Sequence, residues 1–188
     1  LIAFVVVAAV FSYVVLGAGF FTTQKAQEVV YSSVDMASSS MEVLGNVYGN
    51  GTVNTDPTKS RIDALRFVVG LTAGGAAVDL ANTNLVFTGS ENLTDLKRAT
   101  EIKATNLNVI HPTTTYEKGT WYIIDITNGD KGSLLDNQKQ VTIYAVLPAT
   151  NLIHPNDAFS LEIKPPVGTS YAIKRKAPAG IKEINQLN

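Results

Sequence analysis

The chain has few of the side chains that catalysis usually requires. It contains two histidines, His111 and His154, and no cysteine. Each histidine precedes a proline, which favours an extended or turn conformation, and neither has a second histidine three or four residues away as a zinc motif would need. A cysteine nucleophile, a thiolate metal site and a disulfide are excluded. Because a P-loop, a GxGxxG and a GxSxG elbow are also missing, we expect no enzymatic activity and no cofactor.

One region of the sequence gathers side chains that could bind a cation through oxygen. Its members are Asp125, Asn128, Asp130 and Asp136. Oxygen-rich loops can hold Ca²⁺, but the spacing is not that of an EF-hand. Aspartate, asparagine and glycine are also ordinary turn residues, so the sequence predicts a turn at 128–132 and keeps these four residues only as weak metal candidates.

Two acceptor sequons for N-glycosylation are present. They are Asn50-Gly51-Thr52 and Asn92-Leu93-Thr94. Both fall in segments where we expect loops, and each is an acceptor only if the chain is exported. The sequence therefore predicts Asn50 and Asn92 as modification sites of an extracellular protein.

The charged residues are unevenly distributed along the 188 residues. They make up 16% of the chain, and none lies between Leu1 and Gln24. The segment from Leu1 to Phe21 is apolar on all sides and long enough to span a bilayer, so a helix here must be surrounded by lipid or by other protein. A cleavable signal peptide is the alternative, but no basic residue precedes the apolar core, and we expect that a leader was removed upstream of Leu1.

Small residues in this segment would let neighbouring helices approach closely. The residues expected to pack in such a helix bundle are Phe4, Ala8, Ala9, Phe11, Ser12, Val15, Gly17 and Phe20.

A helical rhythm continues beyond the apolar segment. Apolar residues recur about every 3.6 positions from Thr22 to Val47, which predicts an amphipathic continuation that ends near Gly45 to Gly51. The sequence thus divides into a helix over 1–50 and a β domain over 51–188. The expected fold class is α+β, with one long N-terminal helix followed by an antiparallel β-sandwich or barrel.

The remainder alternates β-branched and aromatic runs with turn clusters, as all-β domains do. In the clearest run, Phe159, Leu161 and Ile163 should point inward. Trp121, the one tryptophan, is expected in the core. The predicted strands are Leu65–Leu71, Asn84–Thr88, Ile102–Ile110, Thr120–Thr127, Gln140–Leu147, Ala158–Lys164 and Ser170–Lys176.

Three stretches resemble one known family. They are LIAFVVVAAVFSYVVLGAGFFTTQKAQEVV (Leu1 to Val30), FVVGLTAGGAAVDL (Phe67 to Leu80) and FSLEIKPPVGTSYAIKRKAP (Phe159 to Pro178). Together they are similar to the archaeal flagellins (archaellins), within the type IV pilin class. The family is made with a short basic leader, which is not in this sequence, and no acidic residue lies near Leu1 as in pilins.

The resemblance implies a structural subunit of an extracellular filament that is rotated for swimming. Its partners would be copies of itself, related flagellins, the membrane that holds the precursor before assembly, a prepilin-peptidase-like enzyme and an assembly platform. Net charge is −1 and no basic cluster lies beside aromatic residues, so no nucleic acid is expected. An adhesive type IV pilus subunit is the first alternative, and a membrane-anchored surface receptor or enzyme is the second.

Overall fold

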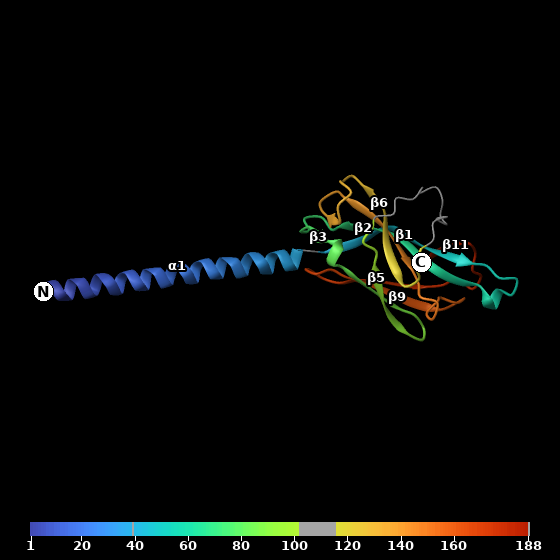
Figure 1. The fold of residues 1–188 in the computed structure, drawn as a ribbon, viewed down its shortest axis with the longest axis horizontal. Helices are drawn as coiled ribbons and strands as arrows, with labels where there is room; N and C mark the ends of the chain where they lie inside the picture. Colours follow the sequence, from blue (N-terminus) through green and yellow to red (C-terminus); the bar gives the residue numbers. More distant parts are fainter. Residues whose placement is uncertain (39, 102–115, 188) are drawn as a thin grey trace. The chain divides into compact units, whose positions relative to one another are not determined.

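The computed structural model describes residues 1–38, 40–101 and 116–187, which form two separate units. One unit is the N-terminal helix, Leu1–Ala37, and the other is the β-rich remainder, Ser38–Asn188. Figure 1 shows a single long helix and a domain built almost wholly from strands. This combination of one long N-terminal helix and a β domain confirms the α+β fold class that the sequence predicted.

Helix α1 spans Ile2–Ser38, 37 residues, or about 55 Å at 1.5 Å per residue. Its first 23 residues, which end at Gln24, have no charged side chain, and the first ion pair on the helix joins Lys25 Nζ to Glu28 Oε2 at 2.6 Å. Three hydroxyls on the helix donate to the carbonyl four residues earlier: Thr22 to Ala18 O, Thr23 to Gly19 O and Ser33 to Val29 O. These hydroxyls therefore need no partner outside the helix.

The second unit contains eleven strands in the part of the chain that the structure describes. They are β1 (Met41–Thr52), β2 (Arg61–Leu71), β3 (Val78–Asp79), β4 (Asn84–Thr88), β5 (Leu93–Arg98), β6 (Thr120–Thr127), β7 (Leu134–Leu135), β8 (Gln140–Val146), β9 (Ala158–Lys164), β10 (Tyr171–Lys176) and β11 (Ile184–Leu187), with short 3₁₀ turns η1 (Pro57–Lys59) and η2 (Leu80–Asn82).

Nine of these strands form one sheet in the order β10-β9-β4-β5-β6-β8-β2-β1-β11, and β3 pairs with β7 separately. All pairs are antiparallel except β5 with β6. Strand β1, near one end of this order, contacts β10 at the other end, so the sheet is nearly closed on itself. Near closure leaves little unpaired edge, which protects a sheet from pairing with other chains.

Helix α1 ends earlier than the sequence predicted. The helix was expected to reach Gly45 to Gly51, but it ends at Ser38, and Met41 to Thr52 form strand β1. Three-residue spacing of apolar side chains suggested a helix, whereas the ladders to β2 and β11 impose an extended backbone. The boundary between the two units therefore lies at Ala37/Ser38, not at 50/51.

A bulge in β1 explains why its side chains do not alternate simply. The register to β2 shifts between Leu44 and Tyr48, and Gly45 lies there with φ +75°. This left-handed conformation favours glycine, and a glycine in it is typical of a β-bulge. Met41 and Val47 are buried, whereas the consecutive residues Gly45 and Asn46 between them are both exposed. Such a break hides the two-residue period that identifies a strand in a sequence.

Most predicted strands are confirmed. Three have the predicted bounds, namely β4, β6 and β9. Strand β2 begins four residues before the predicted Leu65, and β8 and β10 each differ from the prediction by one residue at one end. The predicted strand Ile102–Ile110 lies outside the described residues. Strands β1, β3, β5, β7 and β11 were not predicted.

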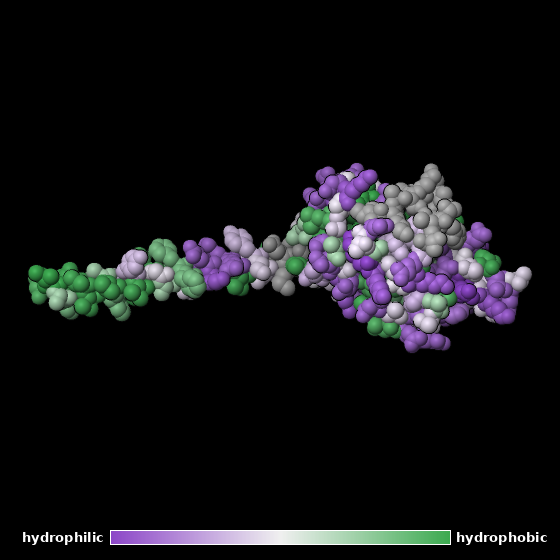
Figure 2. Space-filling model, in the orientation of Figure 1, coloured by the Kyte–Doolittle hydropathy of each residue, from purple (hydrophilic) through white to green (hydrophobic). Residues whose placement is uncertain are grey.

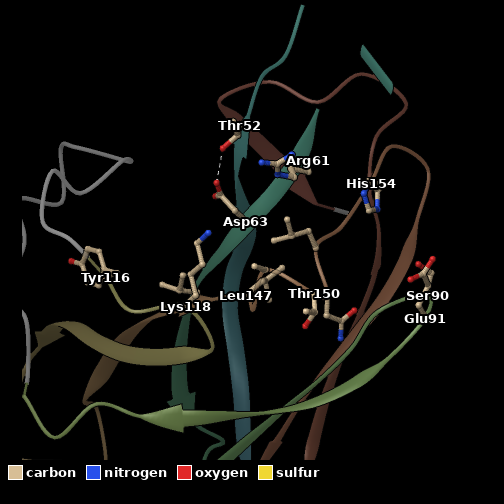
Figure 3. A pocket seen from close by; sticks show the side chains of 14 residues that line it. Thr52, Arg61, Asp63, Ser90, Glu91, Tyr116, Lys118, Leu147, Thr150 and His154 are labelled. Atoms are coloured by element: carbon tan, nitrogen blue, oxygen red, sulfur yellow. Dashed lines mark hydrogen bonds between the residues drawn. The ribbon is translucent and has the colours of Figure 1, made fainter. Parts of the chain in front are cut away.

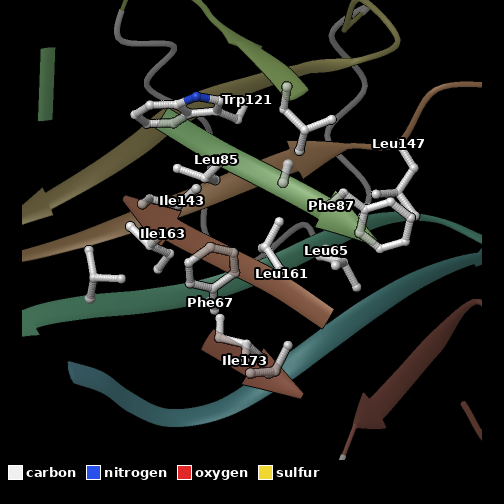
Figure 4. Packing of buried hydrophobic residues seen from close by; sticks show 14 of the residues in the cluster. Leu65, Phe67, Leu85, Phe87, Trp121, Ile143, Leu147, Leu161, Ile163 and Ile173 are labelled. Carbon is white, nitrogen blue, oxygen red and sulfur yellow. The ribbon is translucent and has the colours of Figure 1, made fainter. Parts of the chain in front are cut away.

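The core lies on the inner face of the curved sheet (Figure 4). Phe159, Leu161 and Ile163 are buried, which confirms the inward face predicted for β9. Trp121 is fully buried, as predicted, and the core also draws on β2, β4 and β8. Because these strands are far apart in the sequence, the core forms only when the whole domain folds.

Truncation of a central core side chain should destabilise the β domain strongly. Phe87 is fully buried, so Phe87→Ala should lower the free energy of unfolding by about 3–5 kcal/mol. Urea unfolding of the full chain, followed by the fluorescence of buried Trp121, measures this. Val167→Ala, at a half-exposed position, should change the midpoint little. Equal effects of the two substitutions would contradict the assignment of the core.

Candidate functional site

The surface of helix α1 is the largest apolar surface on the described chain. Every residue from Leu1 to Val34 is exposed, including large side chains such as Phe4 (80%) and Phe11 (70%). The span Ile2–Val34 is long and apolar enough to cross a membrane, and none of it is buried. Figure 2 shows hydrophobic residues covering the N-terminal part of the helix, whereas hydrophilic residues predominate on the visible face of the β domain.

The residues expected to pack in a helix bundle lie on more than one face of α1. Phe4, Ala8, Phe11 and Val15 follow the spacing i, i+4, i+7, i+11 and form one stripe. At 100° per residue, Ala9, Gly17 and Phe20 lie on the opposite side, and Ser12 lies between the two groups. A helix that is apolar on all sides needs partners on all sides, which a bilayer or a bundle of similar helices supplies.

The small residues on α1 are free to accept close neighbours. Ala8, Ala9 and Ser12 are exposed, and a Cβ added at Gly17 would meet nothing within 4 Å in the described residues. Small side chains let helix backbones approach closely in an apolar medium. The structure thus leaves these positions available for contacts with other chains.

The four weak metal candidates do not assemble around one point. Among the residues that the structure describes, no group of three or more carboxylate, histidine or cysteine side chains could hold a metal ion. Instead, Lys139 Nζ donates to Asp130 Oδ1 at 2.5 Å and to Leu134 O at 2.7 Å. Asp125 Oδ2 accepts from Thr127, and Asn128 adopts φ 60°, as the predicted turn requires.

The positive charge next to Asp130 is the ammonium group of Lys139. Its side chain is 1% exposed, whereas Asp130 is 81% exposed. The hydrogen bond from the Lys139 ammonium, followed by its charge, lowers the pKa of Asp130 below the ordinary 3.8. No pattern in the sequence predicts this pair, because a lysine nine residues from an aspartate is ordinarily a surface residue.

The two sequons differ completely in their surroundings. Asn50 lies in β1 rather than in a loop, is fully buried, and donates through Nδ2 to Tyr144 Oη at 2.9 Å. The prediction that Asn50 lies in an accessible loop is therefore wrong. Asn92 lies at the exposed end of the turn between β4 and β5, which agrees with the prediction. Burial raises the pKa of Tyr144 to about 12, and the hydrogen bond donated by Asn50 opposes this rise.

The histidines form no catalytic arrangement in the described ranges. His154 is largely exposed, and its Nδ1 lies 3.4 Å from Asp157 Oδ2. Asp157 also accepts from the backbone N–H of His154 and from Ser90 Oγ, so it stabilises a turn. His111 lies outside the described residues.

An uncovered apolar helix joined to a folded polar β domain defines a class of proteins whose N-terminal helix must be covered by lipid or by other chains. Comparison with known proteins identifies which one. Residues 1–175 match the family model described as archaeal-type flagellin. The chain belongs to the archaeal-type flagellin family and is a structural subunit of an archaeal flagellar filament.

Two relatives and two solved structures support this assignment. A probable flagellin 1 from Archaeoglobus fulgidus is 38% identical over 98% of this chain and 88% of its own length, and probable flagellin 2 from the same organism is 35% identical over 98% and 87%. The archaeal flagellum of Methanospirillum hungatei matches with TM-score 0.70 and 30% identity, over 99% of this chain and 93% of that chain. Archaeal flagellin FlaB1 of Methanocaldococcus jannaschii (TM-score 0.64, 16% identity, 78% and 95% covered) shares the fold.

The Asp130–Lys139 pair should make stability depend on pH. The pKa of Asp130 is depressed in the folded state, so its contribution is present above the unfolded-state pKa and is lost as pH falls toward the folded-state pKa. Between about pH 6 and about pH 2, the wild type should therefore lose more unfolding free energy than Asp130→Asn, as measured by urea unfolding. Lys139→Met should also flatten the dependence, and Asp136→Asn should follow the wild type. A wild-type curve parallel to Asp130→Asn would refute the pair.

Proposed function

We propose that the α1 helices of many subunits pack side by side into the core of the filament and that the β domains coat its outside. The observation that carries the proposal is the first 24 residues of the chain, which have no charge and are exposed over their whole circumference. A filament core removes this surface from water, and subunits that contact one another head to tail generate an open helical polymer. The filament would be rotated for swimming, as the family implies.

The same helix would hold the precursor in the cytoplasmic membrane before assembly. Residues 2–24 measure about 34 Å as a helix, close to the roughly 30 Å of a bilayer core. Lys25 and Glu28, the first charged residues, follow directly and pair with each other. A precursor anchored in this way is a suitable substrate for a membrane peptidase and an assembly platform, which we propose as partners on the family resemblance.

Close packing is the proposed driving force for assembly. A subunit that leaves lipid exchanges one apolar environment for another, so the hydrophobic effect supplies little net free energy. Van der Waals contacts at Ala8, Ala9 and Gly17 would then stabilise the bundle, because small residues allow backbones to approach. The self-bonded hydroxyls of Thr22, Thr23 and Ser33 add no unsatisfied groups to such a core.

A charge in the proposed bundle should prevent assembly. Ala9→Glu should cost about 3 kcal/mol for each buried copy, roughly a 100-fold loss of association, so sheared cell material should contain no filaments in electron micrographs. The cells should also fail to swim in a tracking assay. Ala9→Ser is the matched control, because a small side chain is kept, and it should form filaments.

Two further measurements exclude trivial explanations of that result. Trp121 fluorescence should show a folded β domain in the Ala9→Glu chain, and the membrane fraction should contain it in normal amount. Normal filaments from Ala9→Glu would overturn the buried-core arrangement. If cells that lack these filaments still swim, the proposed role of the filament in swimming is refuted, although the proposed packing of the helices is not.

We also propose that Asn92, and not Asn50, carries a glycan on the exported subunit. An acceptor asparagine must reach the active site of a transferase, and Asn92 is exposed in a turn. Asn50 is fully buried in a paired strand with its amide bound to Tyr144, so a glycan there is incompatible with the folded domain.

Mass spectrometry of peptides from native filaments checks the choice between the sequons. The peptide with Asn92 should carry an added mass in most copies, and the peptide with Asn50 should have its unmodified mass in nearly all. Asn92→Gln should remove the added mass, whereas Thr94→Ser should keep it, because serine preserves the acceptor pattern. A glycan found at Asn50 in assembled filaments would contradict both the proposal and the β1 pairing.

A further inference from the structure

A half-open cavity of about 560 Å³ lies in the β domain, within the size range of ligand sites. It is lined by the start of β2, the β4–β5 turn, residues before β6, and the 146–154 segment. Figure 3 shows side chains from these separate segments around a shared space, with Arg61, Lys118 and Ser90 contributed by different elements.

Several polar side chains around the cavity have no partner in the described part of the chain. Arg61, Lys118, Glu91 and Thr150 make no side-chain hydrogen bond or ion pair with any residue that the structure describes. Asp63, in contrast, accepts from Thr52 Oγ1 at 2.6 Å. The free set therefore offers cationic donors, a carboxylate acceptor and a hydroxyl that does both.

The charges around the cavity balance. Two cations, Arg61 and Lys118, face two carboxylates, Asp63 and Glu91. Because these four charges sum to zero, the cavity has no excess positive charge to attract a phosphate and no excess negative charge to attract a metal ion. A mixture of donors and acceptors without net charge fits a neutral ligand rich in hydroxyl groups, because each hydroxyl donates and accepts.

The sequon at Asn92 directly follows two residues that line the cavity. Ser90 and Glu91 line the cavity and directly precede Asn92. Asn151, a lining residue that is 4% exposed, donates through Nδ2 to Asn92 O at 2.8 Å and to Thr94 Oγ1 at 3.2 Å. One buried amide thus holds both ends of the acceptor sequence against the cavity.

The approach of Asn151 requires glycine at the base of the turn. A Cβ at Gly89 would lie 2.2 Å from Asn151 Oδ1, so no other residue leaves room for this side chain. Gly89 N donates to Asn92 O, which closes the turn between β4 and β5. The hydrogen bonds of Asn151 therefore fix the β4–β5 turn to a segment that lines the cavity.

The face of the β4–β5 hairpin that carries Thr94 lies against Asn151, a residue that lines the cavity. Phe87 pairs with Thr94 and both belong to the face of the hairpin that carries buried Leu96. Asn92 lies directly before β5, exposed in the turn at the end of this hairpin. Asn151 and the cavity lie on that face, because Asn151 contacts Thr94 Oγ1.

We propose that the cavity seats the first sugars of a glycan attached to Asn92 of the same subunit. This inference rests on the proposed modification of Asn92. Arg61 and Lys118 would donate to sugar hydroxyls, Glu91 would accept from them, and Thr150 would do either. The glycan would then cover the 146–154 segment instead of extending freely into solvent, and it would act as a part of the folded domain.

Amide hydrogen exchange of glycosylated filaments in D₂O tests the seating. Exchange in peptides covering 149–154 should be about tenfold faster in Asn92→Gln than in the wild type, as the loss of one or two hydrogen bonds to charged groups would give. The double variant Arg61→Ala/Lys118→Ala should show the same acceleration while its glycan mass is unchanged. Lys131→Ala, at an exposed position outside the cavity, should keep the wild-type rate.

Each outcome either supports or overturns the proposal. Unchanged exchange in Asn92→Gln, or slow exchange in the double variant, would show that the glycan does not occupy the cavity. An unmodified Asn92 would overturn the inference at its first step. Electron micrographs of every sample separate these results from a failure of assembly, since filaments should form whether or not a glycan is seated. Any variant that does not assemble is compared with dissociated wild-type subunits.

Discussion

An apolar helix that its own chain leaves uncovered is the constraint on which the rest of this protein depends. From Leu1 to Gln24 no side chain is charged, and no residue of this stretch is buried. Water cannot surround such a surface without a large free-energy cost, so lipid or other subunits must. In the filament to which this family contributes its subunits, other copies of the chain can meet this requirement. The helix also explains why charge is concentrated in the remaining part of the chain.

The β domain must fold without help from the helix, and its architecture meets that need. The nine-stranded sheet nearly closes on itself, and one core fills its inner face. Phe87, Trp121 and Leu161 have essentially no exposed surface. Long-range pairing, such as that of β1 with β11, ties the last residues of the chain to the first strand of the domain. Because most large apolar side chains of the domain are buried in its own core, its exterior can be largely polar.

Tertiary burial, more than local sequence, decides which polar groups of the domain are available for chemistry. Asn50 and Asn92 have the same acceptor pattern, yet one is buried against Tyr144 and the other is exposed at a turn. The acidic loop after β6 looks like a weak cation site in the sequence, but Lys139 reaches Asp130 from across the loop. Buried Asn151 likewise donates a hydrogen bond to Asn92 O, about sixty residues away in the sequence, and no sequence motif predicts this contact.

The sequence by itself determined the long helix, the predominance of strands after it and the family, because each depends on local periodicity, composition or residue identity. It also placed β4, β6 and β9 at their observed bounds, since their apolar runs end at clear turn residues. Only the tertiary structure decided that Met41 to Thr52 form a strand, because the ladders to β2 and β11 and the bulge at Gly45 override a helical spacing. The tertiary structure also decided the accessibility of the sequons and the cavity beside Asn92, since these depend on contacts between segments distant in the sequence. The Asp130–Lys139 pair depends instead on how the loop between β6 and β8 folds back on itself.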